Sequence, residues 1–185
     1  TYMHSGESKK LLFNINNYSK FKDKIIYIVV DTPPPHLFEF NDDDNLDSKE
    51  SKMTLNASKR ELYQIKKTQD GLGKADPNDI IIVSDVDEIP NLEKVDFKTI
   101  NQKLIFFKQK MFYYKLNLFY KQMPWYGSKA CKKKHFKSPQ WLRSIKNKKY
   151  PLWRFDILFS QLKYNDIYYI ENGGWHFTNV RQPIE

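Results

Sequence analysis

The sequence predicts an α/β protein in which a mainly parallel central sheet is flanked by helices. Two continuous apolar runs, residues 25–30 and 80–83, have the length of buried strands, and an amphipathic helical pattern lies between them. A strand, a helix and a second strand in this order form the βαβ unit of parallel sheets. The chain has 185 residues, of which 40% are hydrophobic, and this is enough for one domain with its own core. We therefore expect residues 1–185 to form a single domain.

In the first half of the chain, the elements follow from local patterns. Residues 25–30 are β-branched apart from Tyr27, and three prolines follow after Asp31 and Thr32. This pattern predicts a buried strand that ends in a conformationally rigid segment. The acidic segment 39–52 predicts a mobile loop. Apolar positions that recur at helical spacing over residues 55–72 predict a helix of about four turns. After a turn at residues 76–79, the continuous apolar run 80–83 predicts a strand covered on both faces.

The second half predicts longer strands and one short helix. Residues 103–108 and 111–120 are rich in aromatic and other apolar side chains, which favours partly exposed strands. Ser138 before Pro139 is typical of an N-cap followed by proline in the first turn, so a short helix is expected there. Residues 166–170 predict a last strand.

Charge and composition exclude several classes of protein. The net charge is +9, and residues 97–155 hold 16 of the 31 lysines and arginines without one acidic residue. A solvated lysine-rich surface explains this, and so does a surface for polyanions or an anionic cofactor. An aromatic content of 16% excludes a disordered chain, and no apolar run approaches the roughly 20 residues that span a bilayer. The single cysteine, Cys131, excludes an intrachain disulfide and favours a cytoplasmic location.

The sharpest local feature is Ser84-Asp85-Val86-Asp87-Glu88, directly after the second predicted strand. Ligands of α/β sheets bind at the carboxyl ends of strands, and clustered carboxylates repel one another unless a cation separates them. Alternate residues project to one side, so Asp85 and Asp87 are expected to face one ligand while Val86 turns into the core. This spacing suits a hard divalent cation together with nucleotide phosphates, although acids in a surface turn are also common.

A second segment, Asn172-Gly173-Gly174-Trp175-His176-Phe177-Thr178, also carries candidate chemistry. Two glycines allow the backbone to approach a ligand closely, and His176 at a strand end can present an imidazole nitrogen to a metal. A structural histidine packed beside Trp175 is the alternative.

Several short pieces of the chain stand in a characteristic order. They are Glu61-Leu62-Tyr63-Gln64, Gly71-Leu72, the run from Asp79 through the acidic motif to Pro90, Trp125-Tyr126-Gly127, Ser138-Pro139, Leu142-Arg143 and Gly173-Gly174-Trp175-His176-Phe177-Thr178. In this order they resemble glycosyltransferase family 17, the β-1,4-N-acetylglucosaminyltransferases that include the enzyme adding bisecting GlcNAc to N-glycans. The resemblance covers essentially the whole chain.

The resemblance implies a GT-A type nucleotide-sugar-binding fold, a UDP-sugar donor such as UDP-GlcNAc, a glycan acceptor and a Mn²⁺ or Mg²⁺ ion. It implies that Asp85, Asp87 and His176 hold the metal. Arg143 joins Asp85 and Asp87 as a candidate for the diphosphate site because guanidinium matches phosphate geometry, and an ordinary arginine on a surface helix is the alternative. The metal would offset the charge that develops on the leaving UDP.

Two features depart from the family. Ile65 stands where the family has an arginine after Glu-x-x-Gln, and residues 1–13 resemble the part that follows the family's first strand. Because the chain also stops just past Thr178, we expect a fragment truncated at both ends. An inverting mechanism needs a carboxylate base; Asp156 and Glu171 are available, and the catalytic residue stays unassigned. Animal members of the family act in the Golgi lumen. This differs from the cytoplasmic location that the single cysteine favours for this chain.

Two other functions remain open. Residues 129–137 interleave lysines with Phe136, next to Trp125 and Trp141, as single-strand nucleic-acid binders do. This alternative ignores the acidic motif, and a metal nuclease would need a lysine where Ile89 and Pro90 stand. A catalytically inactive glycosyltransferase-like interaction domain is the other alternative. We expect no nucleic-acid partner and no membrane segment in this chain.

Overall fold

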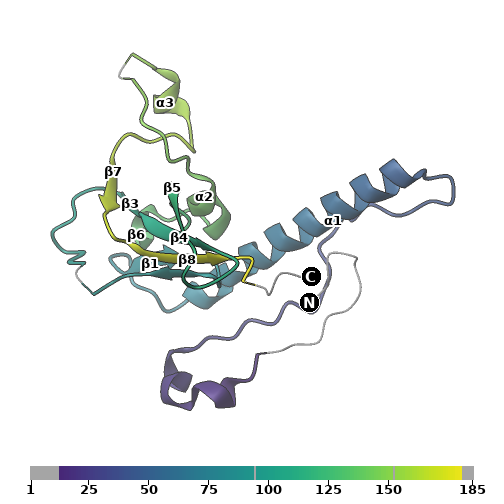
Figure 1. The fold of residues 1–185 in the computed structure, drawn as a ribbon, viewed down its shortest axis with the longest axis horizontal. Coiled ribbons are helices and arrows are strands. Elements are labelled where there is room, and N and C mark those ends of the chain that lie inside the picture. The colour runs from purple at the N-terminus through teal and green to yellow at the C-terminus, as the bar shows by residue number, and fades with distance from the viewer. Residues whose placement is uncertain (1–12, 94, 152, 181–185) are drawn as a thin grey trace. The chain divides into compact units, whose positions relative to one another are not determined.

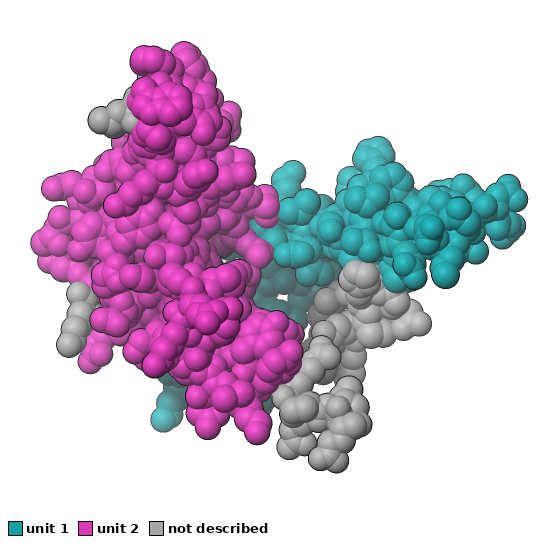
Figure 2. Space-filling view, turned by 45° about the horizontal axis from the view of Figure 1, so that its top comes forward, with its two compact units in different colours: residues 1–74 teal, residues 75–185 magenta. Residues whose placement is uncertain are grey.

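The computed structural model describes residues 13–180 except 94 and 152. The chain divides into two compact units, residues 1–74 and residues 75–185, which are teal and magenta in Figure 2. The single domain predicted over residues 1–185 stays a prediction. Residues 1–12 carry most of the segment that resembles the part after the family's first strand, and they lie outside the described residues.

Among its described residues, the first unit contains one long helix. α1 (Leu46–Lys67) begins at Asn45, whose side-chain oxygen accepts a hydrogen bond from the Ser48 amide at 2.8 Å, and it leads into the 3₁₀ helix η2 (Thr68–Leu72). The prediction of a loop over residues 39–52 is therefore wrong from Leu46 onward. An asparagine cap and Asp47 in the first turn stabilise the helix start, and both effects outweigh the low apolar content of the segment.

Residues 25–30 follow the 3₁₀ helix η1 (Ile15–Lys24), and they pair with no strand in the described part of the chain. The predicted buried strand is wrong, because Ile26 is 66% exposed. β-Branched residues favour an extended backbone, but a strand forms only where a partner supplies hydrogen bonds. A buried contact within the described part of this unit lies elsewhere. The Asn56 side-chain amide of α1 accepts a hydrogen bond from the backbone N–H of Phe38 and donates one to its carbonyl, both at 2.8 Å.

The second unit contains two mixed sheets, each of four strands among the described residues (Figure 1). The first sheet has the order β1 (Ile80–Val83), β6 (Lys129–Lys132), β3 (Leu104–Phe107), β7 (Ile167–Ile170), and the second has the order β2 (Glu88–Pro90), β8 (Gly174–Thr178), β4 (Gln109–Tyr113), β5 (Phe119–Trp125). Only β3 with β7 and β4 with β8 run parallel, and the other ladders are antiparallel. The mixed α/β class is confirmed, and the mainly parallel sheet is wrong.

The strand predicted over residues 80–83 occurs as β1, and its two faces are covered as expected, since Val83 packs against one core cluster and Ile80 and Ile82 against the other. Among the described strands, β1 lies at the edge of its sheet and pairs with β6 alone, antiparallel from Ile80 opposite Lys132 to Val83 opposite Lys129. A continuous apolar run therefore does not distinguish an edge strand with two covered faces from a central strand.

The two sheets are joined strand by strand. β1 leads through residues 84–87 into β2, β3 through Lys108 into β4, β5 through residues 126–128 into β6, and β7 through residues 171–173 into β8. We call these four connecting segments the seam. The acidic motif, the Trp-Tyr-Gly piece and the Gly-Gly piece all begin in the seam or directly beside it, so the topology gathers segments that are far apart in the sequence.

The core lies on both faces of the first sheet. Along β3, Leu104 and Phe106 belong to one buried cluster and Ile105 and Phe107 to another, as the alternation of a strand requires. Leu142 of α2 (Pro139–Ser144) packs into the first cluster.

Cys131 lies in the same cluster as Leu142, and burial raises the pKa of its thiol to about 12.

The short helix predicted after Ser138 is confirmed as α2. Its N-cap is Ser138, whose hydroxyl accepts a hydrogen bond from the Trp141 amide at 3.0 Å. The remaining helical turns are η3 (Lys133–His135) and α3 (Asp156–Phe159). Among the helices that the structure describes, none combines the length and the apolar character needed to cross a bilayer.

Three of the predicted strands occur. They are β1, β3 and β7, which lie within the predicted ranges 80–83, 103–108 and 166–170. The range 111–120, predicted as one strand, contains the end of β4, a turn and the start of β5. The hairpin was missed because its turn, residues 114–118, contains neither glycine nor proline, and because the left-handed position at φ 62° is taken by Tyr114.

Candidate functional site

The acidic motif forms a turn at the end of β1. The Glu88 amide donates to the Asp85 carbonyl at 3.1 Å, which closes the turn over residues 85–88. Because a turn does not alternate its side chains as a strand does, Val86 is fully exposed. The prediction that Val86 turns into the core is wrong, and with it the argument that Asp85 and Asp87 share one face.

Asp85 and Arg143 are neighbours although 58 positions separate them. The Arg143 guanidinium, at the end of α2, donates to an Asp85 carboxylate oxygen at 2.9 Å. Their side chains are 28% and 40% exposed, so the ion pair is open to water and to a ligand. Two of the predicted diphosphate residues thus lie side by side.

Asp87 and His176 meet across the seam. The Asp87 Oδ1 atom is 3.9 Å from His176 Nδ1, which is too long for a hydrogen bond. Nδ1 of His176 is buried and has no hydrogen-bond partner in the described part of the chain. A divalent ion with ligand distances of about 2.0 to 2.2 Å would fit between a carboxylate oxygen and an imidazole nitrogen at this spacing.

The full three-ligand set is not assembled. Of the three predicted metal ligands, the structure brings Asp87 and His176 together, while Asp85 contacts Arg143. Among the described residues, no group of three or more His, Cys, Asp or Glu side chains is arranged to hold a metal. Metal binding through Asp87 and His176 therefore needs oxygen ligands from a substrate, as Mg²⁺ and Mn²⁺ sites on phosphates commonly have.

Glu88 is the buried centre of the site, although the sequence indicated only that it belongs to an acidic turn. Its carboxylate accepts from the Trp125 indole at 2.6 Å, the Asp85 amide at 3.0 Å and the Ser128 hydroxyl at 3.2 Å. Only 6% of Glu88 is exposed. A buried carboxylate is costly unless it is fully hydrogen-bonded, and here donors from two segments of the seam and from the end of β5 satisfy it.

Trp125 links Glu88 to His176. The Trp125 ring stacks on the His176 ring with centroids 4.5 Å apart and planes at 14°, while its indole N–H is held by Glu88. In the β2–β8 ladder, Glu88 is also directly opposite His176. The histidine therefore packs on Trp125, and not on its neighbour Trp175 as the structural alternative proposed.

The glycines of the second motif serve strand packing. Gly174 has φ +124°, and a Cβ atom there would lie 2.0 Å from the Ile89 carbonyl oxygen of β2. The expectation that these glycines admit a ligand is corrected, because the close backbone belongs to the neighbouring strand.

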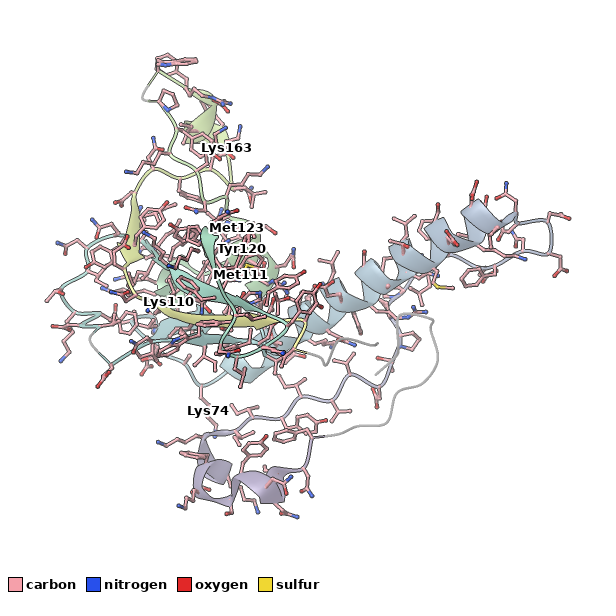
Figure 3. All side chains as sticks on the ribbon, viewed as in Figure 1. Lys74, Lys110, Met111, Tyr120, Met123 and Lys163 are labelled. Atoms are coloured by element: carbon pink, nitrogen blue, oxygen red, sulfur yellow. The ribbon has the colours of Figure 1, made fainter. Side chains whose placement is uncertain are left out.

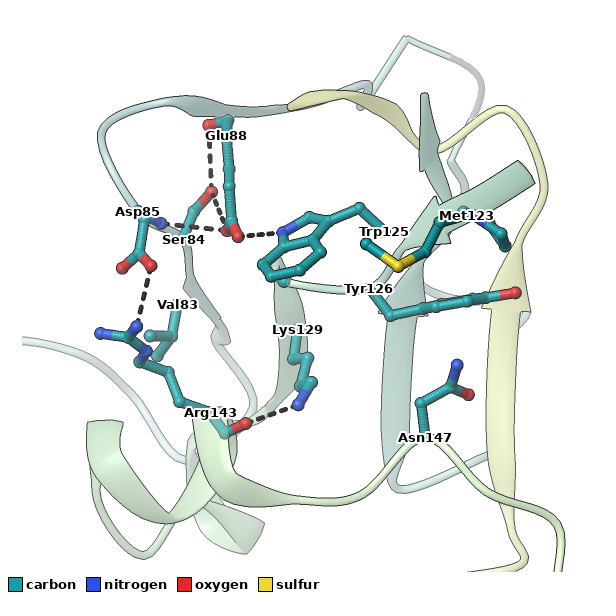
Figure 4. A pocket seen from close by; sticks show the side chains of 12 residues that line it. Val83, Ser84, Asp85, Glu88, Met123, Trp125, Tyr126, Lys129, Arg143 and Asn147 are labelled. Carbon is teal, nitrogen blue, oxygen red and sulfur yellow. Dashed lines mark hydrogen bonds and ion pairs between the residues drawn. The ribbon is translucent and has the colours of Figure 1, made fainter. Parts of the chain in front are cut away.

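A cavity of about 430 Å³ lies beside this network (Figure 4). Figure 4 shows the Asp85–Arg143 pair at one side of it, the Trp125 ring in the middle, and Tyr126 and Asn147 at the other side. The cavity has the size of typical small-molecule sites, and it combines aromatic faces with charged and amide groups. Trp125 lines the cavity and contacts His176, so it connects the cavity to the Asp87–His176 pair.

Lys129 forms part of the cavity wall with an unusual environment. Its ammonium donates to the carbonyls of Arg143 and Ile145 at 2.5 and 2.7 Å, and only 6% of the residue is exposed. Burial lowers the pKa of Lys129 from 10.5 to about 8, although nearby Glu88 opposes this shift.

The lowered pKa of Lys129 predicts a rise in stability at alkaline pH. Between the folded pKa of about 8 and the unfolded value of 10.5, the unfolded chain holds a proton that the folded chain has lost. The unfolding free energy of the wild type should therefore rise relative to Lys129→Met by about 1 to 2 kcal/mol between about pH 7.5 and about pH 9.5. Urea unfolding at both pH values measures it, and parallel pH curves for the two proteins would contradict it.

The two acids considered as catalytic base differ in their surroundings. Asp156 accepts from Arg154 and Lys163, and these hydrogen bonds hold the pKa of its carboxyl well below the usual range, which makes it a poor base. Glu171 lies in the seam and is paired with Lys108 at 2.8 Å. These contacts do not assign either acid as the catalytic base.

The aromatic residues near the lysine-rich segment are largely engaged. Tyr126, Phe136 and Trp141 pack against the core cluster around Leu142. Lys133 and Lys134 donate to Ala75 and Asn78 of the preceding turn. The interleaved pattern that motivated the nucleic-acid alternative therefore forms a packed surface instead of a row of open rings.

Comparison of the chain with protein-family models, with curated proteins and with solved structures finds no match. The geometry of the seam and the sequence motifs therefore carry the functional argument.

Proposed function

We propose that this chain is a metal-dependent glycosyltransferase domain of GT-A type that uses a UDP-sugar, with UDP-GlcNAc as the first donor to test. The observation that carries the proposal is the meeting of Asp87 with His176, 89 positions later, with a buried imidazole nitrogen left without a partner among the described residues. A buried nitrogen without a hydrogen-bond partner is costly, and here it faces a carboxylate oxygen at 3.9 Å, which is too far for a hydrogen bond. A shared cation between them would satisfy both groups.

In this proposal, each residue has a defined task. Asp87 and His176 hold a Mn²⁺ or Mg²⁺ ion, which when bound offsets the negative charge on the departing UDP diphosphate. Arg143 binds a diphosphate oxygen by exchanging its contact with Asp85, which is possible because the pair is partly exposed. Glu88 and Trp125 fix the plane of the His176 ring, since one holds the indole and the indole stacks on the imidazole.

The cavity beside Trp125 is proposed to hold the donor. Aromatic side chains offer flat surfaces to rings, and Asp85 and Asn147 offer hydrogen-bonding groups to hydroxyls. The transfer to a glycan acceptor would invert the anomeric carbon, with a carboxylate base still to be assigned.

We expect UDP to bind this protein with Mn²⁺ present and not with EDTA. Isothermal titration calorimetry with UDP measures this, and a product assay with UDP-GlcNAc reports hydrolysis or transfer. Single-stranded DNA added at low and high salt separates the nucleic-acid alternative, because its binding would weaken strongly with salt and ignore Mn²⁺. UDP binding that is equally tight in EDTA would contradict the metal assignment, and UDP binding without turnover would favour the inactive interaction domain.

A further inference from the structure

A second cavity, of about 290 Å³, lies on the second sheet where β4 and β5 separate. Its lining includes Lys108, Lys110, Lys121, Tyr120, Met123 and Glu171. Figure 3 labels Lys110 on β4 and Tyr120 and Met123 on β5. No residue assigned above to the metal or the diphosphate lines this cavity.

The cavity exists because β5 bulges away from β4. Gln109 pairs with Trp125 and Met111 pairs with Tyr120, so a single residue of β4 faces residues 121–124 of β5. The surplus residues leave the ladder, and Pro124 among them has no N–H to donate. Bulges of this kind are common next to active sites, where they redirect side chains and open space beside the sheet.

The charge of the cavity favours an anion. Glu171 neutralises Lys108 at 2.8 Å. In the part of the chain that the structure describes, Lys110 and Lys121 contact no carboxylate. Both lie within the stretch of residues 97–155 that contains no acidic residue, so no nearby acid in sequence offsets them. Two uncompensated ammonium groups at one concave site attract a carboxylate or a phosphate.

The size and the exposed side chains favour a sugar. The volume is at the lower end of the range for small-molecule sites, which suits a ligand of about one ring. Tyr120 is 44% and Met123 is 45% exposed, so an aromatic ring and a thioether stand open beside the lysines. An apolar surface flanked by hydrogen-bonding groups matches the face and the rim of a pyranose ring.

We propose that this second cavity binds an acidic sugar unit, bearing a carboxylate or a phosphate, of the glycan acceptor. The acceptor role rests on the proposed function, because the two cavities share Met123 and Pro124 and a donor in the first would be adjacent to an acceptor in the second. Lys110 and Lys121 bind the acidic group, and Tyr120 packs against the ring.

The test is an NMR titration of the ¹⁵N-labelled protein, without UDP or metal, with glucuronate, glucose 1-phosphate, glucose and inorganic phosphate. We expect both acidic sugars to shift the amide signals of residues 108–110 and 119–123 and to bind at least about tenfold more tightly than glucose. The double variant Lys110→Gln with Lys121→Gln should lose about tenfold in affinity, whereas the variant with arginine at both positions should retain binding.

The matched control is Lys98→Gln, which makes the same change at an exposed lysine that does not line this cavity and should leave binding unchanged. Equal affinity for glucose and glucuronate, or an unaffected double variant, would overturn the proposal. Inorganic phosphate binding as tightly as glucose 1-phosphate would overturn its sugar part. The titration uses neither UDP nor metal, so its result is independent of the proposed function. If the wild-type protein binds glucuronate but not UDP, the transferase function is rejected and the acidic-sugar site is kept.

Discussion

Asp87→Asn is expected to lower the Mn²⁺-dependent affinity for UDP by about 10- to 100-fold. The amide keeps the shape of the side chain but removes the negative charge that faces Nδ1 of His176 at 3.9 Å. The Asp87 side chain is 40% exposed, so the unfolding free energy should change by no more than about 0.5 kcal/mol. Isothermal titration calorimetry with Mn²⁺ and UDP, together with urea unfolding, measures both quantities.

Asp166→Asn is the matched control, because it makes the same chemical change at an exposed aspartate that lines neither cavity. It should leave both the affinity and the stability unchanged. If Asp87→Asn binds UDP with Mn²⁺ as tightly as the wild type does, Asp87 is not a metal ligand.

Gly127→Ala is expected to destabilise the protein by about 3 kcal/mol. A Cβ atom at this position would lie 1.5 Å from a Glu88 carboxylate oxygen and 2.2 Å from the Trp125 indole nitrogen. A flexible carboxylate could move away in open solvent, but here it is buried and held by the Asp85 amide and Ser128. The substitution therefore breaks the hydrogen bond between Glu88 and Trp125, and urea unfolding measures the cost.

The matched control for this change is Gly73→Ala. A Cβ atom at Gly73 would meet nothing within 4 Å, and its backbone φ of −58° suits alanine. We expect this variant to be as stable as the wild type or more stable by up to about 1 kcal/mol. Gly127→Ala should also weaken Mn²⁺ binding, because Trp125 can no longer hold the His176 ring. If Gly127→Ala is as stable as the wild type, the packing argument is refuted.

Local chemistry explains which features were predictable from sequence. The α2 cap at Ser138 needs only neighbouring atoms, because a hydroxyl, a proline and a backbone amide within three residues specify it. The strands β3 and β7 were predictable for a similar reason, since their side chains are apolar at nearly every position. By contrast, the start of α1 at Leu46 was missed because hydrophobic periodicity carries no information about a cap in an acidic segment.

The sequence by itself determined the candidate chemistry: an acidic motif after an apolar strand, a histidine 89 positions after Asp87, and a basic stretch without acids. Only the tertiary structure decided how these groups combine. Strand pairing is a contact between segments that are distant in the sequence. No local pattern therefore shows that β1 is an edge strand among the described residues, or that the strands divide into two sheets connected by the seam. The same pairing buries Glu88 opposite His176, turns Asp85 toward Arg143, and leaves Asp87 facing an imidazole nitrogen with no other described partner.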